Sequence, residues 1–276
     1  MRETALRVAG ELMQVTGVQA VVLGGSHCTG TATEASDLDI GVYYAGNLDV
    51  AAMDGVLSRL DDAGRQGLLN APGQWGKWIN GGAWLTVEGQ KTDILLRDAQ
   101  RVQSVIDDCQ QGKVTMDFQA GHPFGFCNAI YMGEVKYCLP LCDPLHVMEG
   151  LKKRADPVSP VYRRAASGWF LWEAGFSFQT GRSSVKKQDI VYACGCLFKG
   201  ILCLVQATYA AHGEILLNEK GALRRLSQYP FCPQGLVEAA EAALSGLDRL
   251  TLAASFDMME KKFQEVSKLL ESNGSV

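Results

Sequence analysis

The chain has 276 residues, of which 47 % are hydrophobic and 20 % are charged. This is ordinary globular composition, and it provides enough apolar material for the two domains that we expect. The net charge of −4, from 26 basic and 30 acidic residues, excludes a strong field that would draw the protein to a nucleic-acid backbone or an anionic membrane. The composition therefore favours a small-molecule partner.

The nine cysteines and the N-terminal segment indicate a reducing compartment. Their number is odd, and "MRETALRVAGELMQ" lacks the apolar stretch of a signal peptide, so we expect free thiols in a cytoplasmic protein. Two pairs, Cys138 with Cys142 and Cys194 with Cys196, could also be interpreted as metal ligands. The apolar stretch 190–211 contains polar interruptions, which favours a core helix over a membrane span.

The first part of the chain alternates helix-period and strand-period segments, which predicts an α+β domain over residues 1–144. Asp49 is the expected N-cap of one helix, and "EGQ" is the expected turn of a hairpin. Residues 125–144 are expected to form strand or irregular structure. The other expected elements, in chain order, are a helix over 3–15, a strand over 18–25, a short helix opening 27–35, a strand over 38–44, a helix over 49–60, hairpin strands over 83–87 and 92–96, and a helix over 99–110.

The remainder of the chain predicts an all-helical bundle over residues 145–276. Leu, Ala and Val recur there at helical spacing, and Asp, Gly and Pro gather at breaks such as "DPVSP" and "QYPFCPQG". The expected helices cover 145–154, 160–180, 185–212, 218–227, 234–245 and 248–271.

A polar loop separates the first two expected strands and has the composition of a phosphate-binding turn. Gly24, Gly25 and Ser26 follow a buried strand and precede a short helix. Glycine lets backbone N–H groups approach phosphate oxygens, and a helix N-terminus adds positive potential. The same three residues are also typical of an ordinary turn that binds no ligand.

Three aspartates form the second part of the expected site. Asp37 and Asp39 stand two residues apart at the head of a strand, so their carboxylates share one face, and Asp93 begins another buried strand. Half-buried carboxylates of this kind need a neutralising cation, and one or two Mg²⁺ ions accept carboxylate and phosphate oxygens. The pattern predicts a site for phosphoryl or nucleotidyl transfer.

The spacing of these motifs resembles the minimal nucleotidyltransferases of the DNA polymerase beta superfamily. "GGS", ten further residues, "DLD" at the start of an apolar strand and a later acid carry the resemblance, strengthened by "GTATEASD". The layout of a transferase domain followed by a helical bundle is similar to aminoglycoside and lincosamide nucleotidyltransferases. The resemblance implies that Asp37 and Asp39 are metal ligands, that Gly25 and Ser26 contact the triphosphate, and that Asp93 is a third ligand or the catalytic base.

Two further residues have both a functional and an ordinary interpretation. Lys220 in "GEILLNEKGALRRL" resembles a lysine that reaches nucleotide phosphates in antibiotic-modifying relatives, but "NEKG" also fits a solvated helix start capped by Asn218. Glu134 could act as a general base or hold a substrate amine, or it could form an edge-strand ion pair with Lys136.

Together these features predict a cytoplasmic enzyme that transfers a nucleoside monophosphate, AMP from ATP or another NTP, to a hydroxyl of a small molecule. An aminoglycoside or lincosamide-type antibiotic is the acceptor class that the resemblance implies. The alternatives are a nucleotidyltransferase acting on a protein or a tRNA and a nucleotide-binding regulatory or antitoxin-like module. A homodimer is compatible with the sequence, and neither a membrane nor a nucleic acid is an expected partner.

Overall fold

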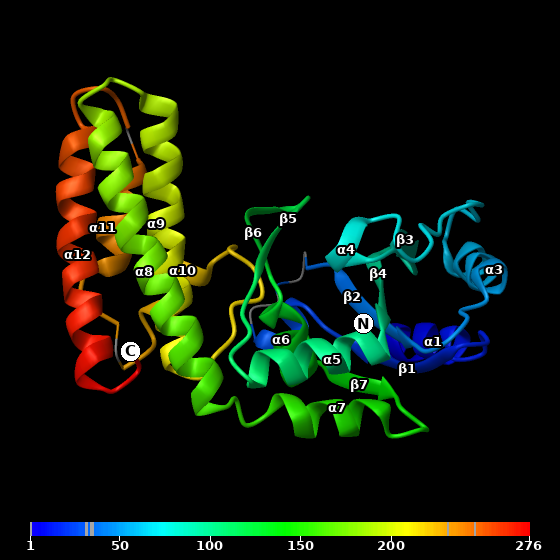
Figure 1. Cartoon of the computed structure of the whole chain (residues 1–276). Helices are drawn as coiled ribbons and strands as arrows, with labels where there is room; N and C mark the ends of the chain where they lie inside the picture. The colour runs from blue at the N-terminus through cyan, green and yellow to red at the C-terminus, as the bar shows by residue number, and fades with distance from the viewer. Residues whose placement is uncertain (1, 31–32, 34–35, 231, 246) are drawn as a thin grey trace. The chain divides into compact units, whose positions relative to one another are not determined.

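The computed structural model describes residues 2–30, 33, 36–230, 232–245 and 247–276, and it has an α+β fold with a helical C-terminal region (Figure 1). The chain divides into two compact units. One unit comprises Met1–Asp107, Asp117–Gly121 and Ile130–Pro157, and the other comprises Asp108–Met116, His122–Ala129 and Val158–Val276. This division differs from the expected boundary after residue 144, because α7 (Val147–Ala155) belongs to the first unit.

The first unit is built on a mixed five-stranded sheet with the order β3-β4-β2-β1-β7. Strand β2 runs parallel to β4, whereas β1 is antiparallel to β2 and β7, and β3 is antiparallel to β4. The bounds are β1 (Val18–Leu23), β2 (Leu38–Tyr44), β3 (Gly82–Val87), β4 (Gln90–Asp98) and β7 (Leu139–Cys142). The expected strands of this sheet are confirmed, and β7 takes part of the segment expected to be strand or irregular.

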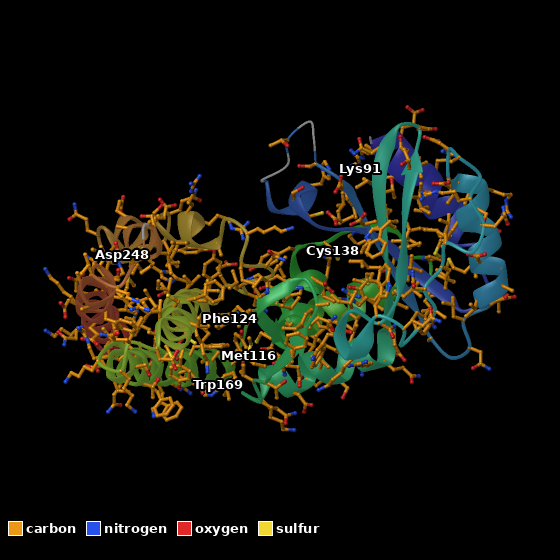
Figure 2. The ribbon with its side chains drawn as sticks, turned by 90° about the horizontal axis from the view of Figure 1, so that it is seen from above. Lys91, Met116, Phe124, Cys138, Trp169 and Asp248 are labelled. Carbon is orange, nitrogen blue, oxygen red and sulfur yellow. The ribbon has the colours of Figure 1, made fainter. Side chains whose placement is uncertain are left out.

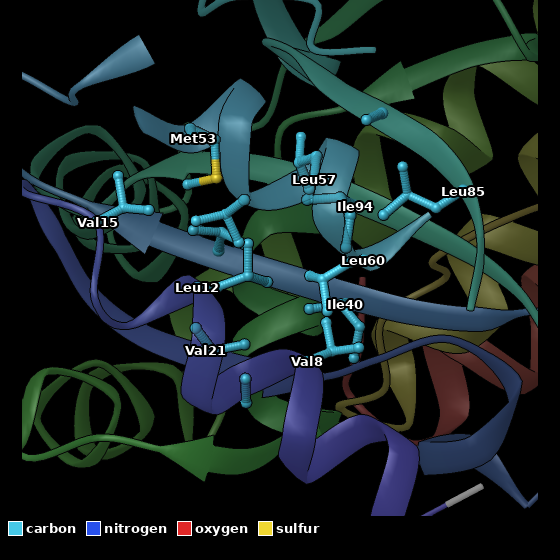
Figure 3. Packing of buried hydrophobic residues seen from close by; sticks show 14 of the residues in the cluster. Val8, Leu12, Val15, Val21, Ile40, Met53, Leu57, Leu60, Leu85 and Ile94 are labelled. Atoms are coloured by element: carbon cyan, nitrogen blue, oxygen red, sulfur yellow. The ribbon is translucent and has the colours of Figure 1, made fainter. Parts of the chain in front are cut away.

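One face of this sheet packs on two helices and forms the core of the unit. Helices α1 (Arg2–Leu12) and α3 (Val50–Leu60) bury their apolar sides against alternate residues of the strands (Figure 3). Leu12, Ile40 and Ile94 are fully buried there. The Asp49 side chain accepts a hydrogen bond from Ala52 N at 2.9 Å, which confirms it as the N-cap of α3.

Helix α6 (Ala129–Tyr137) corrects the expectation of strand or irregular structure over 125–144. Most of its residues are buried, including Tyr131, Met132 and Val135, so the sequence shows no polar stripe of helical period. A short, largely buried segment without such a stripe cannot be distinguished from a strand by periodicity. Its place in the fold is fixed by tertiary contacts, among them the bond from Tyr131 Oη to Trp78 O at 2.6 Å.

Four short elements and the predicted helix over 99–110 complete the part of the chain before residue 145. Helix α5 (Ala99–Gln110) is confirmed as predicted. Strands β5 (Met116–Gln119) and β6 (His122–Cys127) form a separate two-stranded sheet, and α4 (Gly76–Ile79) precedes β3. Helix α2 (Ser26–Thr29) opens the segment expected to begin with a short helix, of which Thr31, Ala32, Glu34 and Ala35 lie outside the described residues.

The second unit is dominated by long helices, as the sequence predicts. Helices α8, α9 and α12 lie side by side (Figure 1), and a Cβ on Gly200 of α9 would overlap the ring of Phe178 on α8. The bounds are α8 (Pro160–Val185), α9 (Ile190–Ala211), α10 (Ala222–Leu226), α11 (Leu236–Leu244) and α12 (Leu252–Ser272), so the helix expected over 218–227 is shorter. Within the described residues α9 alone is long and apolar enough to cross a membrane, and more than half of its most apolar window is buried.

Candidate active site

The two central carboxylates of the predicted site lie directly opposite each other on the sheet. Asp39 of β2 is the Cα partner of Asp93 on the parallel strand β4, so the two side chains leave the same face about 5 Å apart at their Cα atoms. Both residues are half-buried. Asp37 comes just before β2 and is exposed. The structure therefore brings together the acids that the sequence places 54 residues apart.

The glycine loop contacts this pair through Asp39. Gly24 N donates a hydrogen bond to Asp39 O at 2.8 Å. Gly25 has φ 59° and ψ −148°, and a Cβ built on it would overlap the Asp39 carboxylate. No side chain other than hydrogen fits this approach, which explains why glycine stands here. Ser26 follows as the first residue of α2.

The electrostatics of the pair favour the binding of a cation. Burial, followed by the neighbouring carboxylates of Asp93 and Asp37, raises the pKa of Asp39 to about 6, while His27 opposes this shift. A bound divalent cation would remove the repulsion, and carboxylate oxygens are suitable ligands. Within the described ranges no group of three His, Cys, Asp or Glu side chains is gathered closely enough to hold a metal by itself. The arrangement fits an ion that shares its coordination between Asp39, Asp93 and substrate oxygens.

Glu134 lies on α6 rather than on the edge strand that its sequence context suggested. Its oxygens accept hydrogen bonds from Arg97 Nε and Nη2, both at 2.8 Å. The Arg97 side chain is only 2 % exposed, compared with 27 % for Glu134, and it also donates to Ile79 O. Lys136 Nζ lies 3.6 Å from Asp156 Oδ1. The alternative ion pair between Glu134 and Lys136 stays a prediction. A catalytic role for Glu134 stays a prediction.

Lys220 belongs to the second unit. Its backbone N donates to Asn218 Oδ1 at 2.9 Å, a local turn that precedes α10. This hydrogen bond agrees with the interpretation of "NEKG" as a helix start at which the Asn218 side chain caps a backbone N–H. Contact of Lys220 with nucleotide phosphates stays a prediction.

Sequence reasoning missed two residues on the face that carries the acids. Arg97 follows Asp93 by four positions, and Trp84 of β3 is the Cα partner of Asp93. The hairpin turn between β3 and β4 is the sequence feature that could have located Trp84. Glu88 and Gly89 form a two-residue loop, and both have positive φ, at 53° and 74°. A two-residue loop fixes the register and places Trp84 opposite Asp93.

Part of the chain matches a known protein family. Residues 6–102 match the family model described as a nucleotidyltransferase domain. No curated protein matches the chain. Among solved structures, a nucleotidyltransferase-like protein from Exiguobacterium sibiricum 255-15 is 12 % identical with a TM-score of 0.46, covering 99 % of this chain and 75 % of that one. A chain of the E. coli MS115-1 CdnC:HORMA-deltaN complex is 14 % identical with a TM-score of 0.26, covering 96 % and 89 %.

Proposed function

From the match of residues 6–102 to the model of a nucleotidyltransferase domain, we propose that the protein is an enzyme that transfers AMP from ATP to a hydroxyl of a small molecule. Transfer of a nucleoside monophosphate from an NTP is the general chemistry of the domain. The choice of ATP, of Mg²⁺ and of a small acceptor is our proposal, as is action in the reducing cytoplasm. The net charge of −4 supports the small acceptor, because a nucleic-acid track would need basic contacts to phosphate.

The observation that carries the proposal is the contact between the glycine loop and the acid pair. The Gly25 backbone lies against the Asp39 carboxylate, and Asp39 opposes Asp93. A triphosphate held by the loop would thus have its phosphates beside both carboxylates. Gly25 and Ser26 would bind the β- and γ-phosphates through backbone N–H groups and the Ser26 hydroxyl.

Asp39 and Asp93, with Asp37 beside them, would hold Mg²⁺. When bound, Mg²⁺ neutralises charge on the phosphate oxygens and on the pyrophosphate that leaves. The carboxylates orient the α-phosphate, and Asp93 is the predicted acceptor of the proton from the attacking hydroxyl. Glu134 is the second candidate for this proton. The new bond joins the acceptor oxygen to the α-phosphorus as the bond from that phosphorus to the bridging oxygen breaks.

The acceptor class that we propose is an aminoglycoside or lincosamide-type compound. The α+β unit together with the helical region has the layout that the sequence resemblance implies. One layout can serve many acceptors, so the test identifies the acceptor directly.

The test is pyrophosphate release from ATP, GTP, CTP and UTP with Mg²⁺ across a panel of aminoglycosides, lincosamides and other hydroxyl compounds. We expect release that depends on one acceptor and is lost in Asp39→Asn. Asp156→Asn is the matched control, because that side chain is 60 % exposed and lies at the C-terminus of α7, where its backbone N–H caps the helix. Metal-dependent nucleotide binding without turnover on any acceptor would instead favour the regulatory module or a macromolecular target.

A further inference from the structure

Two stacked indoles form an exposed aromatic surface on the first unit. The rings of Trp84 and Trp75 are 4.4 Å apart with an interplanar angle of 29°. Trp84 is 60 % exposed although it lies in a strand. A large apolar ring that stays in water next to polar active-site residues is a feature of ligand-binding surfaces.

This aromatic pair lies on the same face of the sheet as the acid pair. Directly opposed residues of neighbouring strands share a face, and Trp84 opposes Asp93, which opposes Asp39. Trp75 is on this face as well, because a Cβ on Gly82, two residues before Trp84, would lie 2.8 Å from the Trp75 ring. The row across the sheet therefore runs from Trp84 through the two carboxylates to the glycine loop.

The backbone that carries the two indoles is held in place by hydrogen bonds. Arg65 Nη2 donates to Trp84 O at 3.2 Å and to Asp61 Oδ1 at 2.6 Å. Asp61 Oδ1 in turn accepts from Thr86 N at 3.1 Å on the same strand. Gln119 Nε2 donates to Trp75 O at 3.1 Å. A surface fixed in this way loses little entropy when a ligand binds.

The order of residues along the row assigns the two ends to different substrates. In an in-line displacement the attacking oxygen and the leaving oxygen lie on opposite sides of the phosphorus. If the glycine loop holds the pyrophosphate and the acid pair holds the α-phosphate, the acceptor hydroxyl must arrive from the Trp84 side. We propose that Trp84 and Trp75 form the platform on which the ring of the acceptor stacks, an inference that rests on the proposed function.

The chemistry of the platform favours a saccharide or cyclitol ring. The indole faces are electron-rich and attract the C–H face of such a ring. Lys91, labelled in Figure 2, shares the face of Asp93 and stands two residues before it, so a positive charge is already present beside the platform. Recognition by ring shape therefore fits this surface better than recognition of a cation alone. In the reaction the ring hydroxyl forms its bond to the α-phosphorus, its proton passes to a carboxylate, and pyrophosphate leaves.

The experiment is isothermal titration calorimetry on the full chain with Mg²⁺ and a non-hydrolysable ATP analogue bound. The probes are neamine, lincomycin and methyl α-D-glucoside, with spermidine as a ring-free polyamine. The variants are Trp84→Leu, Trp84→Phe and the matched control Trp172→Leu, because Trp172 is 61 % exposed and stacks on Phe176 in the other unit. Both tryptophans are exposed, so thermal unfolding should change little.

We expect at least one ring compound to bind the wild type and Trp172→Leu equally, and Trp84→Leu about tenfold more weakly. Trp84→Phe should restore most of the affinity, and spermidine should not distinguish the variants. Three results would overturn the platform. Ring compounds could bind Trp84→Leu as tightly as the wild type, or no ring compound could bind the wild type at millimolar concentration. The third is weaker binding of the ATP analogue to Trp84→Leu than to the wild type. Failure of the proposed function is a separate result: the ATP analogue would then show no Mg²⁺-dependent binding to the wild type.

Discussion

At the scale of single residues, the site depends on one close approach between a backbone and a carboxylate. Gly25 adopts φ 59°, and its missing side chain leaves room for Asp39. Asp39 is half-buried beside Asp93, so its ionised form is destabilised by both desolvation and repulsion. The loop requires glycine at position 25 because the Asp39 carboxylate occupies the space of a Cβ. The Asp39 carboxylate in turn favours a bound cation, because burial and the neighbouring acids destabilise its ionised form.

The raised pKa of Asp39 predicts the pH dependence of stability without metal. Because the native pKa of about 6 exceeds the unfolded value, the protonated form gives stability that is present below about pH 4 and lost as the pH rises through 6. Asp39→Asn should therefore raise the free energy of unfolding of the metal-free protein by roughly 1–3 kcal/mol at pH 8. The difference should vanish near pH 4 in urea titrations followed by circular dichroism. A destabilised variant at pH 8 would contradict this electrostatic account.

At the scale of elements, one buried ion pair attaches α6 to the sheet. Arg97 of β4 forms a two-point contact with Glu134 of α6, and its guanidinium carbon lies 5.2 Å from the Tyr131 ring centroid. A buried guanidinium without its partner is costly, so the pair selects one placement of the helix. This contact joins residues 37 positions apart and could not be inferred from helical periodicity.

Glu134→Gln should lower the free energy of unfolding by roughly 2–4 kcal/mol, because Arg97 would remain buried without a counter-charge. Urea denaturation at pH 7 measures the change. The same substitution at Glu149, which is 51 % exposed and pairs with Lys153, should cost less than about 0.5 kcal/mol. The predicted catalytic role is tested in the same protein: a base at Glu134 would lower kcat and change the pH–rate profile of the folded variant, whereas a positioning role alone would not.

At the scale of the whole molecule, the chain does not divide at a single point. Segments Asp108–Met116 and His122–Ala129 join the second unit, and the chain then returns to the first until Pro157. Helix α7 contributes the buried side chains of Met148 and Leu151 to the first unit. Lys152 Nζ also donates to Lys136 O at 3.0 Å. A change of composition at residue 144 marks where helices begin to dominate, and the first unit continues beyond it.

A fragment ending at residue 157 should therefore be more stable than one ending at 144. Burial of each large side chain of α7 contributes about 1.5–3 kcal/mol, and the ion pair between Arg154 and Asp107 adds to it. Thermal unfolding of fragments 1–144 and 1–157, followed by circular dichroism, should give the higher midpoint for the longer one. Equal midpoints would show that α7 contributes nothing to the first unit.

The sequence alone determined the elements that have a clear period and the polar residues that belong to motifs. The β-branched strands, the capped helix after Asp49, the helical C-terminal region and the loop-plus-aspartate pattern are all local signals, because each depends on residues a few positions apart. Tertiary structure alone decided what depends on pairing between distant segments. It placed Asp39 opposite Asp93, and it made a helix of the largely buried segment around Tyr131, whose sequence shows no polar stripe of helical period. Strand register and buried charge pairs are properties of two segments at once, and neither segment specifies them by itself.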